Sequence, residues 1–81
     1  MNAKEAMRTI KNKYPSKVVV ECLEFNDFYA FALSEPGREN EDVGGGYDTV
    51  SKKNGNVSTF NPTEDFEAFM SATGIDIKTL T

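Results

Sequence analysis

An Asn-Gly pair between two short β-favouring runs constrains the fold of this chain more than any other feature. The runs are Tyr47–Ser51 and Val57–Phe60, and residues 52–55 between them read Lys-Lys-Asn-Gly. Asn and Gly both tolerate positive φ, so the pair indicates a β-hairpin. We expect a type I turn with Gly55 in the left-handed conformation, which adds a bulge. The two lysines are interpreted as ordinary turn residues, and the middle of the chain is predicted to be antiparallel sheet.

Two further strands are predicted before this hairpin. Residues 17–25 are rich in β-branched side chains. Simple alternation places Val18, Val20 and Cys22 on one face of that strand, and the opposite face carries Val19, Glu21 and Leu23. Asn-Asp at positions 26–27 predicts a two-residue turn. Residues 28–33 read Phe-Tyr-Ala-Phe-Ala-Leu and are apolar on both faces, which predicts a central strand covered on both sides.

A helix is predicted on each side of the strands. The first covers Ala3–Lys13, with Asn2 as N-cap and Pro15 stopping it. The second is expected to begin at the capping residue Asn61, with Pro62 as its first helical residue.

An apolar stripe on the second helix is predicted to face the core. It consists of Phe66, Phe69 and Met70, with Thr73 as a further candidate, and Gly74 is the expected residue after the helix. The remaining tail, residues 75–80, has three open alternatives: it docks on the core, adds an edge strand or reaches a neighbouring subunit.

The predicted fold class is therefore α+β. One domain, residues 1–81, holds an antiparallel sheet of three to four strands with an N-terminal and a C-terminal helix, in the order α-β-β-β-β-α. A chain this small often depends on a partner or a covalent staple. Its single cysteine excludes an internal disulfide, so a homo-oligomer is an open alternative.

Residues 35–46 form the one long predicted loop, which is acidic and rich in glycine. Its carboxylates Glu39, Glu41 and Asp42 are the candidate partner-binding residues. They could also hold Ca²⁺ or Mg²⁺, but their spacing fits no recognised calcium loop, so a solvated acidic loop is the expected reading and no cofactor is predicted.

Charge is distributed unevenly along the chain. The net charge is −4, yet residues 1–17 carry five cations against one carboxylate, while the remainder carries four cations against twelve. Overall acidity disfavours nucleic acid as a partner, because nucleic-acid binding requires neutralisation of phosphates.

The N-terminus carries no apolar run typical of a signal peptide, and no stretch approaches the length of a membrane span. We therefore expect a cytoplasmic location without membrane association, where a lone thiol stays reduced.

Catalytic chemistry has little support in the sequence. Without histidine, the Ser-His and Cys-His nucleophile systems cannot be built. Cys22 is interpreted as a buried, inert thiol, because a reactive thiol requires a positive and exposed setting and its neighbours are Glu21 and Glu24. Phe28, Tyr29 and Phe31 could stack on bases but are interpreted as core residues. The protein is not expected to be an enzyme.

Three segments resemble the PepSY-like arrangement of a short helix before an antiparallel sheet. They are residues 3–6 (Ala-Lys-Glu-Ala), 13–19 (Lys-Tyr-Pro-Ser-Lys-Val-Val) and the hairpin 50–57 (Val-Ser-Lys-Lys-Asn-Gly-Asn-Val). The layout, including Phe-Asn-Pro-Thr-Glu at 60–64, also resembles small uncharacterised proteins of bacterial phages and prophages, and this resemblance implies no reaction.

The sequence therefore leaves two functions open. The first is a non-catalytic protein–protein interaction module, a phage or prophage accessory or structural protein. The alternative, which the PepSY resemblance implies, is a PepSY-like or immunity-type inhibitor that acts through the acidic loop 35–46.

Overall fold

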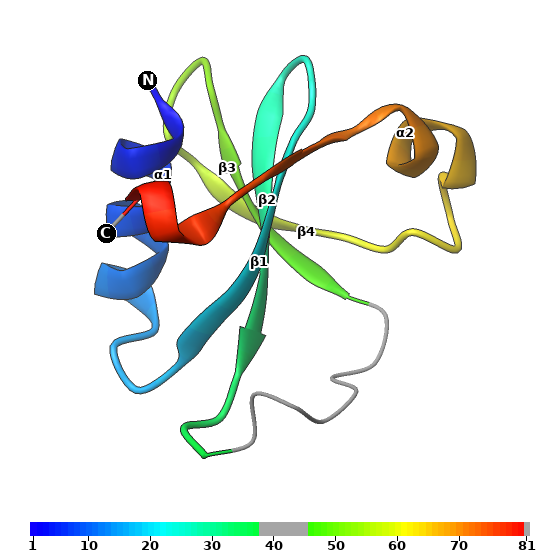
Figure 1. Cartoon of the computed structure of the whole chain (residues 1–81). Helices are drawn as coiled ribbons and strands as arrows, with labels where there is room; N and C mark the ends of the chain where they lie inside the picture. The colour runs from blue at the N-terminus through cyan, green and yellow to red at the C-terminus, as the bar shows by residue number, and fades with distance from the viewer. Residues whose placement is uncertain (38–45, 81) are drawn as a thin grey trace.

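The first four strands follow the predicted order, and additional structure appears near the C-terminus. The computed structural model describes residues 1–37 and 46–80 (Figure 1). Its elements are α1 (Ala3–Lys13), β1 (Val18–Glu24), β2 (Phe28–Ser34), β3 (Tyr47–Ser51), β4 (Val57–Phe60), α2 (Phe66–Ser71), β5 (Thr73–Ile75) and the 3₁₀ helix η1 (Ile77–Leu80). The α+β class with an antiparallel sheet is confirmed.

The strands lie in the order β4-β3-β2-β1-β5, so β2 is the central strand, as its apolar residues predicted. Ala30 and Phe31 point to opposite faces of β2, and both are fully buried. Both faces of the sheet are therefore covered at its centre.

The predicted strand count was too low, because the described chain contains five strands and not three to four. Thr73 and Gly74, expected at the end of a helix, pair with Glu24 and Leu23 on the outer edge of β1. The backbone turns extended at Ala72 (φ −69°, ψ 150°), which ends α2 and starts this edge strand. Of the three alternatives for the tail, two occur together: β5 adds an edge strand, and η1 docks Ile77 and Leu80 on the core.

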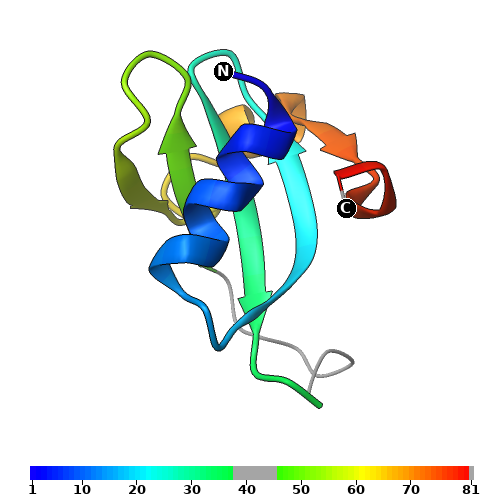
Figure 2. The same cartoon turned by 90° about the vertical axis from the view of Figure 1, so that its left-hand side faces the viewer.

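Helix α1 covers one face of the sheet (Figure 2). Asn2 caps it as predicted, its side-chain oxygen accepting from the Glu5 backbone N–H at 2.9 Å. Apolar residues at helical spacing pack against side chains of β1, β2 and β3. The resulting core cluster consists of Ala6, Met7, Ile10, Val19, Cys22, Tyr29, Phe31 and Val50.

A β-bulge in β1 corrects the predicted alternation of its side chains. Val19 and Cys22 were predicted on opposite faces but share the face covered by α1. The register of β1 on β2 shifts between Val19 and Glu21, and the extra residue moves Cys22 to the same side as Val19.

The β3–β4 hairpin forms as predicted. Val50 pairs with Val57, the Gly55 N–H donates to the Ser51 carbonyl at 2.9 Å, and Gly55 has φ +74°. The turn at positions 26–27 is also confirmed, because the Phe25 N–H donates to the Phe28 carbonyl at 2.9 Å.

The predicted start of the second helix was wrong. The Asn61 side chain accepts from the Thr63 backbone N–H at 3.0 Å and closes a local turn. The helix begins at Phe66 and is capped by Asp65, whose carboxylate accepts from the Ala68 N–H at 3.1 Å. Asn61 and Asp65 are both good caps, and the chain uses the second one for the helix.

Residues 61–72 connect the two opposite edges of the sheet, from β4 to β5. They cross the face opposite α1, as the two views show (Figures 1 and 2). Helix α2 is the middle of this crossing, and none of its six residues is buried. The helix is therefore placed to offer side chains to solvent on that face.

Candidate functional site

The residues predicted to bind a partner, Glu39, Glu41 and Asp42, lie outside the described residues. The structure therefore places none of them, and the candidate site is built from other side chains.

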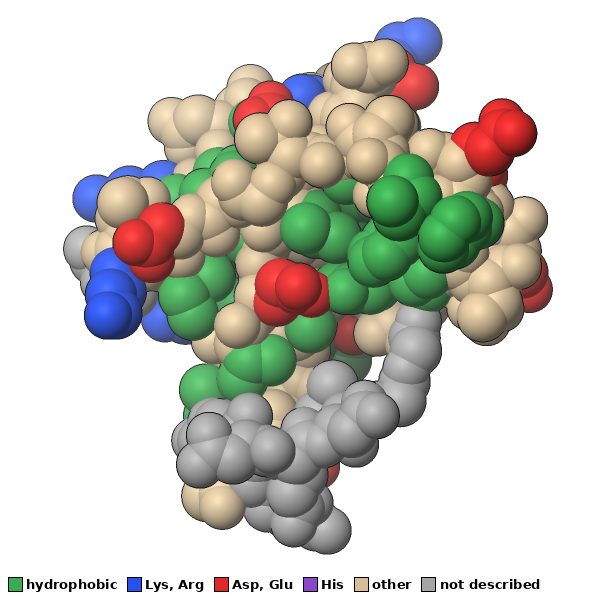
Figure 3. All heavy atoms as spheres, turned by 45° about the vertical axis from the view of Figure 1, so that its right-hand side comes forward, with side chains coloured by type: hydrophobic (Ala, Val, Ile, Leu, Met, Phe, Trp, Pro, Cys, Tyr) green, Lys and Arg blue, Asp and Glu red, His purple; other side chains and the backbone are tan. Residues whose placement is uncertain are grey.

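The most exposed apolar surface on the described chain lies on α2. Phe66 and Met70 are 62% and 66% exposed and stand four residues apart, on one side of the helix. Glu64 and Glu67 are exposed beside them. We call these four residues the α2 surface. In Figure 3, hydrophobic side chains gather on the side of the molecule that carries α2, with acidic side chains nearby.

The stripe predicted to face the core is therefore split. Phe69 turns toward the sheet, where its ring centroid lies 6.0 Å from that of Tyr47. Phe66 and Met70 were predicted to be buried with it, and they are not. A helix of six residues that touches the sheet through one aromatic side chain cannot bury its remaining apolar residues.

Three phenylalanines form a cluster between α2 and the end of the sheet. The rings of Phe25 and Phe28 stack with centroids 4.4 Å apart, and Phe60 lies 5.1 Å from Phe25 and 5.8 Å from Phe28. Each such aromatic pair stabilises the fold by about 1 kcal/mol in addition to the contribution from burial of its apolar area. The cluster holds the Phe25–Phe28 turn against the start of the crossing segment.

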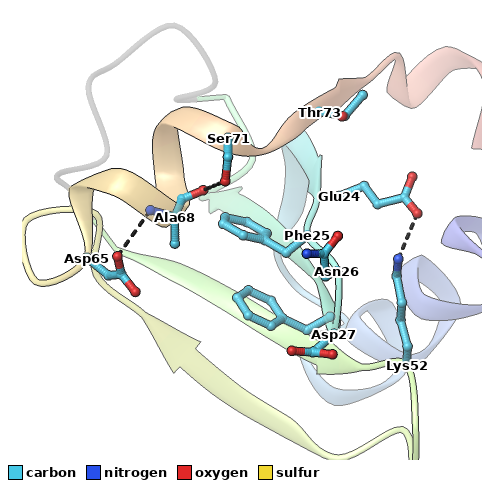
Figure 4. A pocket seen from close by; sticks show the side chains of 10 residues that line it. Glu24, Phe25, Asn26, Asp27, Lys52, Asp65, Ala68, Ser71 and Thr73 are labelled. Atoms are coloured by element: carbon cyan, nitrogen blue, oxygen red, sulfur yellow. Dashed lines mark hydrogen bonds and ion pairs between the residues drawn. The ribbon is translucent and has the colours of Figure 1, made fainter.

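A hollow of about 590 Å³ opens beside this cluster, between the β1–β2 turn and α2 (Figure 4). It is lined by Glu24, Phe25, Asn26, Asp27, Phe28, Lys52, Asp65, Ala68, Ser71 and Thr73. We call it the aromatic hollow. Glu24 and Lys52 form an ion pair of 2.8 Å on one side of it, and this hydrogen bond raises the pKa of Lys52. The hollow therefore combines an aromatic wall with three carboxylates.

One polar bridge crosses this same face of the sheet. The Tyr47 hydroxyl donates to Oε1 of Glu21 at 2.5 Å. Burial, followed by the bond to Glu21, raises the pKa of Tyr47 to about 12. The phenol therefore stays protonated at neutral pH and serves as a fixed donor, not as an acid or base.

Cys22 is buried in the core cluster, as predicted. Burial, with added repulsion from Glu24 and Glu21, raises the pKa of its thiol to about 11. At neutral pH the thiolate is scarce and enclosed, so Cys22 is not a nucleophile available to substrate.

The aromatic residues weighed as base-stacking candidates take structural positions. Tyr29 and Phe31 are buried in the core cluster, and Phe28 belongs to the three-ring cluster. Lys52, interpreted as a turn residue, also lies over the Tyr29 ring at 4.9 Å from its centroid.

A second, smaller hollow of about 250 Å³ lies between α1 and η1. Its lining is Lys4, Met7, Arg8, Lys11, Asn12 and Leu80, and we call it the basic hollow. The three cations recur at helical spacing on one side of α1 and are exposed. No ion pair joins any of the three to another residue within 1–37 or 46–80.

Within the described ranges, no three acidic, Cys or His side chains gather as a metal site would require. Among those same residues, no helix combines the length and apolar character needed to cross a membrane.

Sequence reasoning missed Phe66 and Met70 as surface residues. A usable signal was present in Glu64, Asp65 and Glu67, which surround Phe66 with negative charge and suit a solvent-facing helix. The cations of the basic hollow lie off the apolar stripe of α1, so their exposure followed from the helical spacing.

Comparison with protein-family models, curated proteins and solved structures found no match. The resemblance to PepSY-like and phage proteins is neither supported nor contradicted by these comparisons.

Proposed function

We propose that this protein is a non-catalytic protein–protein interaction module that binds its partner through the α2 surface. The observation that carries the proposal is the exposure of Phe66 and Met70 on a helix without a single buried residue. Large apolar side chains exposed together, with polar residues around them, are typical of an interaction site.

The exposed apolar area of Phe66 and Met70 is too small to form a stable interface by itself. Phe66 and Met70 each expose on the order of 100 Å². Burying both would contribute roughly 5 kcal/mol before the entropic cost of association. A stable interface buries about 1,200–2,000 Å² in total, so a partner must also cover the surrounding face, including the aromatic hollow.

The chemistry of the described residues supports a binding role over catalysis. Cys22 is enclosed and protonated, and the raised pKa of Tyr47 keeps its proton in place. Neither group has a pKa near 7, where a general acid or base works best.

The biological setting remains a proposal from the sequence. A phage or prophage accessory role and a cytoplasmic location are compatible with a small interaction module. Identifying the partner tests both.

The experiment is capture of a partner from an extract of the source cells, followed by purification of that partner and measurement of its dissociation constant by calorimetry. Replacing both apolar residues (Phe66→Ser with Met70→Ser) should weaken binding about tenfold or more, since roughly 1.4 kcal/mol gives a factor of ten. Both side chains are largely exposed, so the double variant should fold.

Lys53→Ser, an exposed change in the β3–β4 turn, is the matched control and should leave affinity unchanged. A partner that binds the double variant as tightly as the wild type would refute the α2 surface as the site. If alanine at Glu39, Glu41 and Asp42 abolished binding instead, the inhibitor function would replace our proposal.

A further inference from the structure

The basic hollow and the α2 surface complement each other in charge. The hollow presents Lys4, Arg8 and Lys11 without an ion-pair partner among the described residues. The α2 surface presents Glu64 and Glu67, both exposed and likewise without an ion pair in the described part of the chain. Each surface carries the charge that the other lacks.

The two surfaces also complement each other in apolar character. The half-buried Leu80 and the edge of the largely buried Met7 line the basic hollow together with the cations. On the α2 surface, the exposed Phe66 and Met70 accompany the exposed carboxylates Glu64 and Glu67. Each surface therefore combines apolar and charged side chains, as protein interfaces commonly do.

The basic hollow and the α2 surface are similar in length. From Lys4 to Lys11 the helix rises about 10 Å, and the six residues of α2 span about 9 Å. The hollow, at about 250 Å³, lies below the usual range for small-molecule pockets, so it suits inserted side chains better than a small ligand.

The two surfaces cannot meet within one chain. Helices α1 and η1 lie on one side of the sheet and α2 lies on the other (Figures 1 and 2). Contact between them therefore requires two molecules.

We propose that copies of this protein associate head to tail, with the α2 surface of one molecule seated in the basic hollow of the next. This rests on the proposed function, which makes the α2 surface a binding site, and it names a second copy as a partner. The contact is heterologous, because each molecule uses a different surface on its two sides. Association can therefore extend beyond a dimer, either to a closed ring or to an open chain.

The test is sedimentation velocity over a range of concentrations, with two single variants that each disable one surface. Arg8→Glu reverses a charge in the basic hollow, and Met70→Glu places a charge at an apolar position of the α2 surface. Both residues are exposed, and circular dichroism with a denaturation midpoint verifies the fold of each variant.

The wild type should show mass that rises with concentration, and each variant alone should associate about tenfold more weakly. An equal mixture of the two should form a dimer and nothing larger, because one intact hollow and one intact α2 surface remain. Added salt should weaken wild-type association, since the Debye length falls from about 10 Å at 0.1 M to about 3 Å at 1 M.

Three results would overturn the proposal: a monomeric wild type at every concentration, unchanged association of Arg8→Glu, or a mixture that stays monomeric. Unchanged association of Arg8→Glu with loss in Met70→Glu would indicate a symmetric contact between two α2 surfaces. If the wild type stayed monomeric but bound a labelled oligonucleotide, and Arg8→Glu abolished that binding, the basic hollow would be a nucleic-acid site. A monomeric wild type leaves the proposed function intact, because that function is tested by the affinity of a purified heterologous partner.

Discussion

The Tyr47 hydroxyl donates to Glu21 Oε1 at 2.5 Å across the central strand of the sheet. Glu21 pairs with Ala32, and the β2–β3 register, continued by one residue, places Ala32 beside Tyr47 as well. The small alanine leaves room for the tyrosine side chain to reach from β3 to β1. One side-chain hydrogen bond thus links β1 and β3, the two strands that flank β2.

Removing this bond with Tyr47→Phe should lower the free energy of unfolding by about 1 kcal/mol, the usual net value of one hydrogen bond. Urea denaturation at neutral pH measures the change. Tyr14→Phe is the matched control, because its hydroxyl makes only a 3.3 Å bond to Asp48 and should cost less. Equal losses of unfolding free energy in the two variants would contradict a stabilising hydrogen bond between Tyr47 and Glu21.

Burial of Tyr47, together with its bond to Glu21, predicts a dependence of stability on pH. The folded protein raises the pKa of Tyr47 from 10.0 to about 12, so it holds this proton more tightly than the unfolded chain does. The contribution to stability is complete below pH 10 and declines as the pH rises from about 10 to about 12. The difference in unfolding free energy between wild type and Tyr47→Phe should therefore shrink across that window, and a constant difference would refute the assignment.

Replacement of two phenylalanines by alanine should change the free energy of unfolding by very different amounts. Phe31 is fully buried in the central strand, so Phe31→Ala should lower the free energy of unfolding by about 3–5 kcal/mol. Phe66 is 62% exposed, so Phe66→Ala should change it by no more than about 0.5 kcal/mol. Chemical denaturation of both variants measures the contrast. A large loss at Phe66 would mean that its side chain is buried in solution.

Two glycines offer a similar comparison. Gly55 has φ +74°, a left-handed conformation that costs other residues about 1–2 kcal/mol, so Gly55→Ala should destabilise by that amount. Gly74 is not in that conformation, and a Cβ added there would meet nothing within 4 Å, so Gly74→Ala should be nearly neutral. Thermal denaturation can rank the two variants. Reversed effects would argue against the hairpin turn described above.

The thiol of Cys22 should be unreactive in the folded protein. It is buried, and its pKa of about 11 leaves little thiolate at neutral pH. Labelling by a disulfide reagent should be about a hundredfold or more slower than in denaturant, since it requires local opening. Comparable rates in the two conditions would mean that the thiol is accessible.

The elements that could be predicted are those specified by neighbouring residues. The β3–β4 turn depends on Asn54 and Gly55, and the start of α1 depends on Asn2. The central position of β2 followed from its two apolar faces.

The wrong predictions concern segments whose structure depends on residues far away in the sequence. Asn61 and Asp65 are equally good caps, and the choice depends on how the chain crosses the sheet. Residues 73–75 are too short to show a strand pattern, and they become β5 because the edge of β1 lies beside them. Position 20 gives no warning of the bulge, since residues 18–20 are all valine.

The candidate site was less predictable than the fold. The spacing of Phe66, Phe69 and Met70 predicted one shared face, but only Phe69 contacts an aromatic ring of the sheet. Whether an apolar stripe is buried depends on the position of its helix above the sheet, which a local pattern does not contain.

The exposure of the α2 surface is tested most directly by oxidation of methionine with peroxide, followed by mass spectrometry of each site. Met70 is 66% exposed and Met7 is 4% exposed, so the same side chain reports on both environments, with the 49% exposed Met1 as reference. We predict that Met70 in the dilute protein oxidises at a rate close to that of Met1 and at least about tenfold faster than Met7. Met70 protected as strongly as Met7, under conditions where the protein is monomeric, would contradict the account.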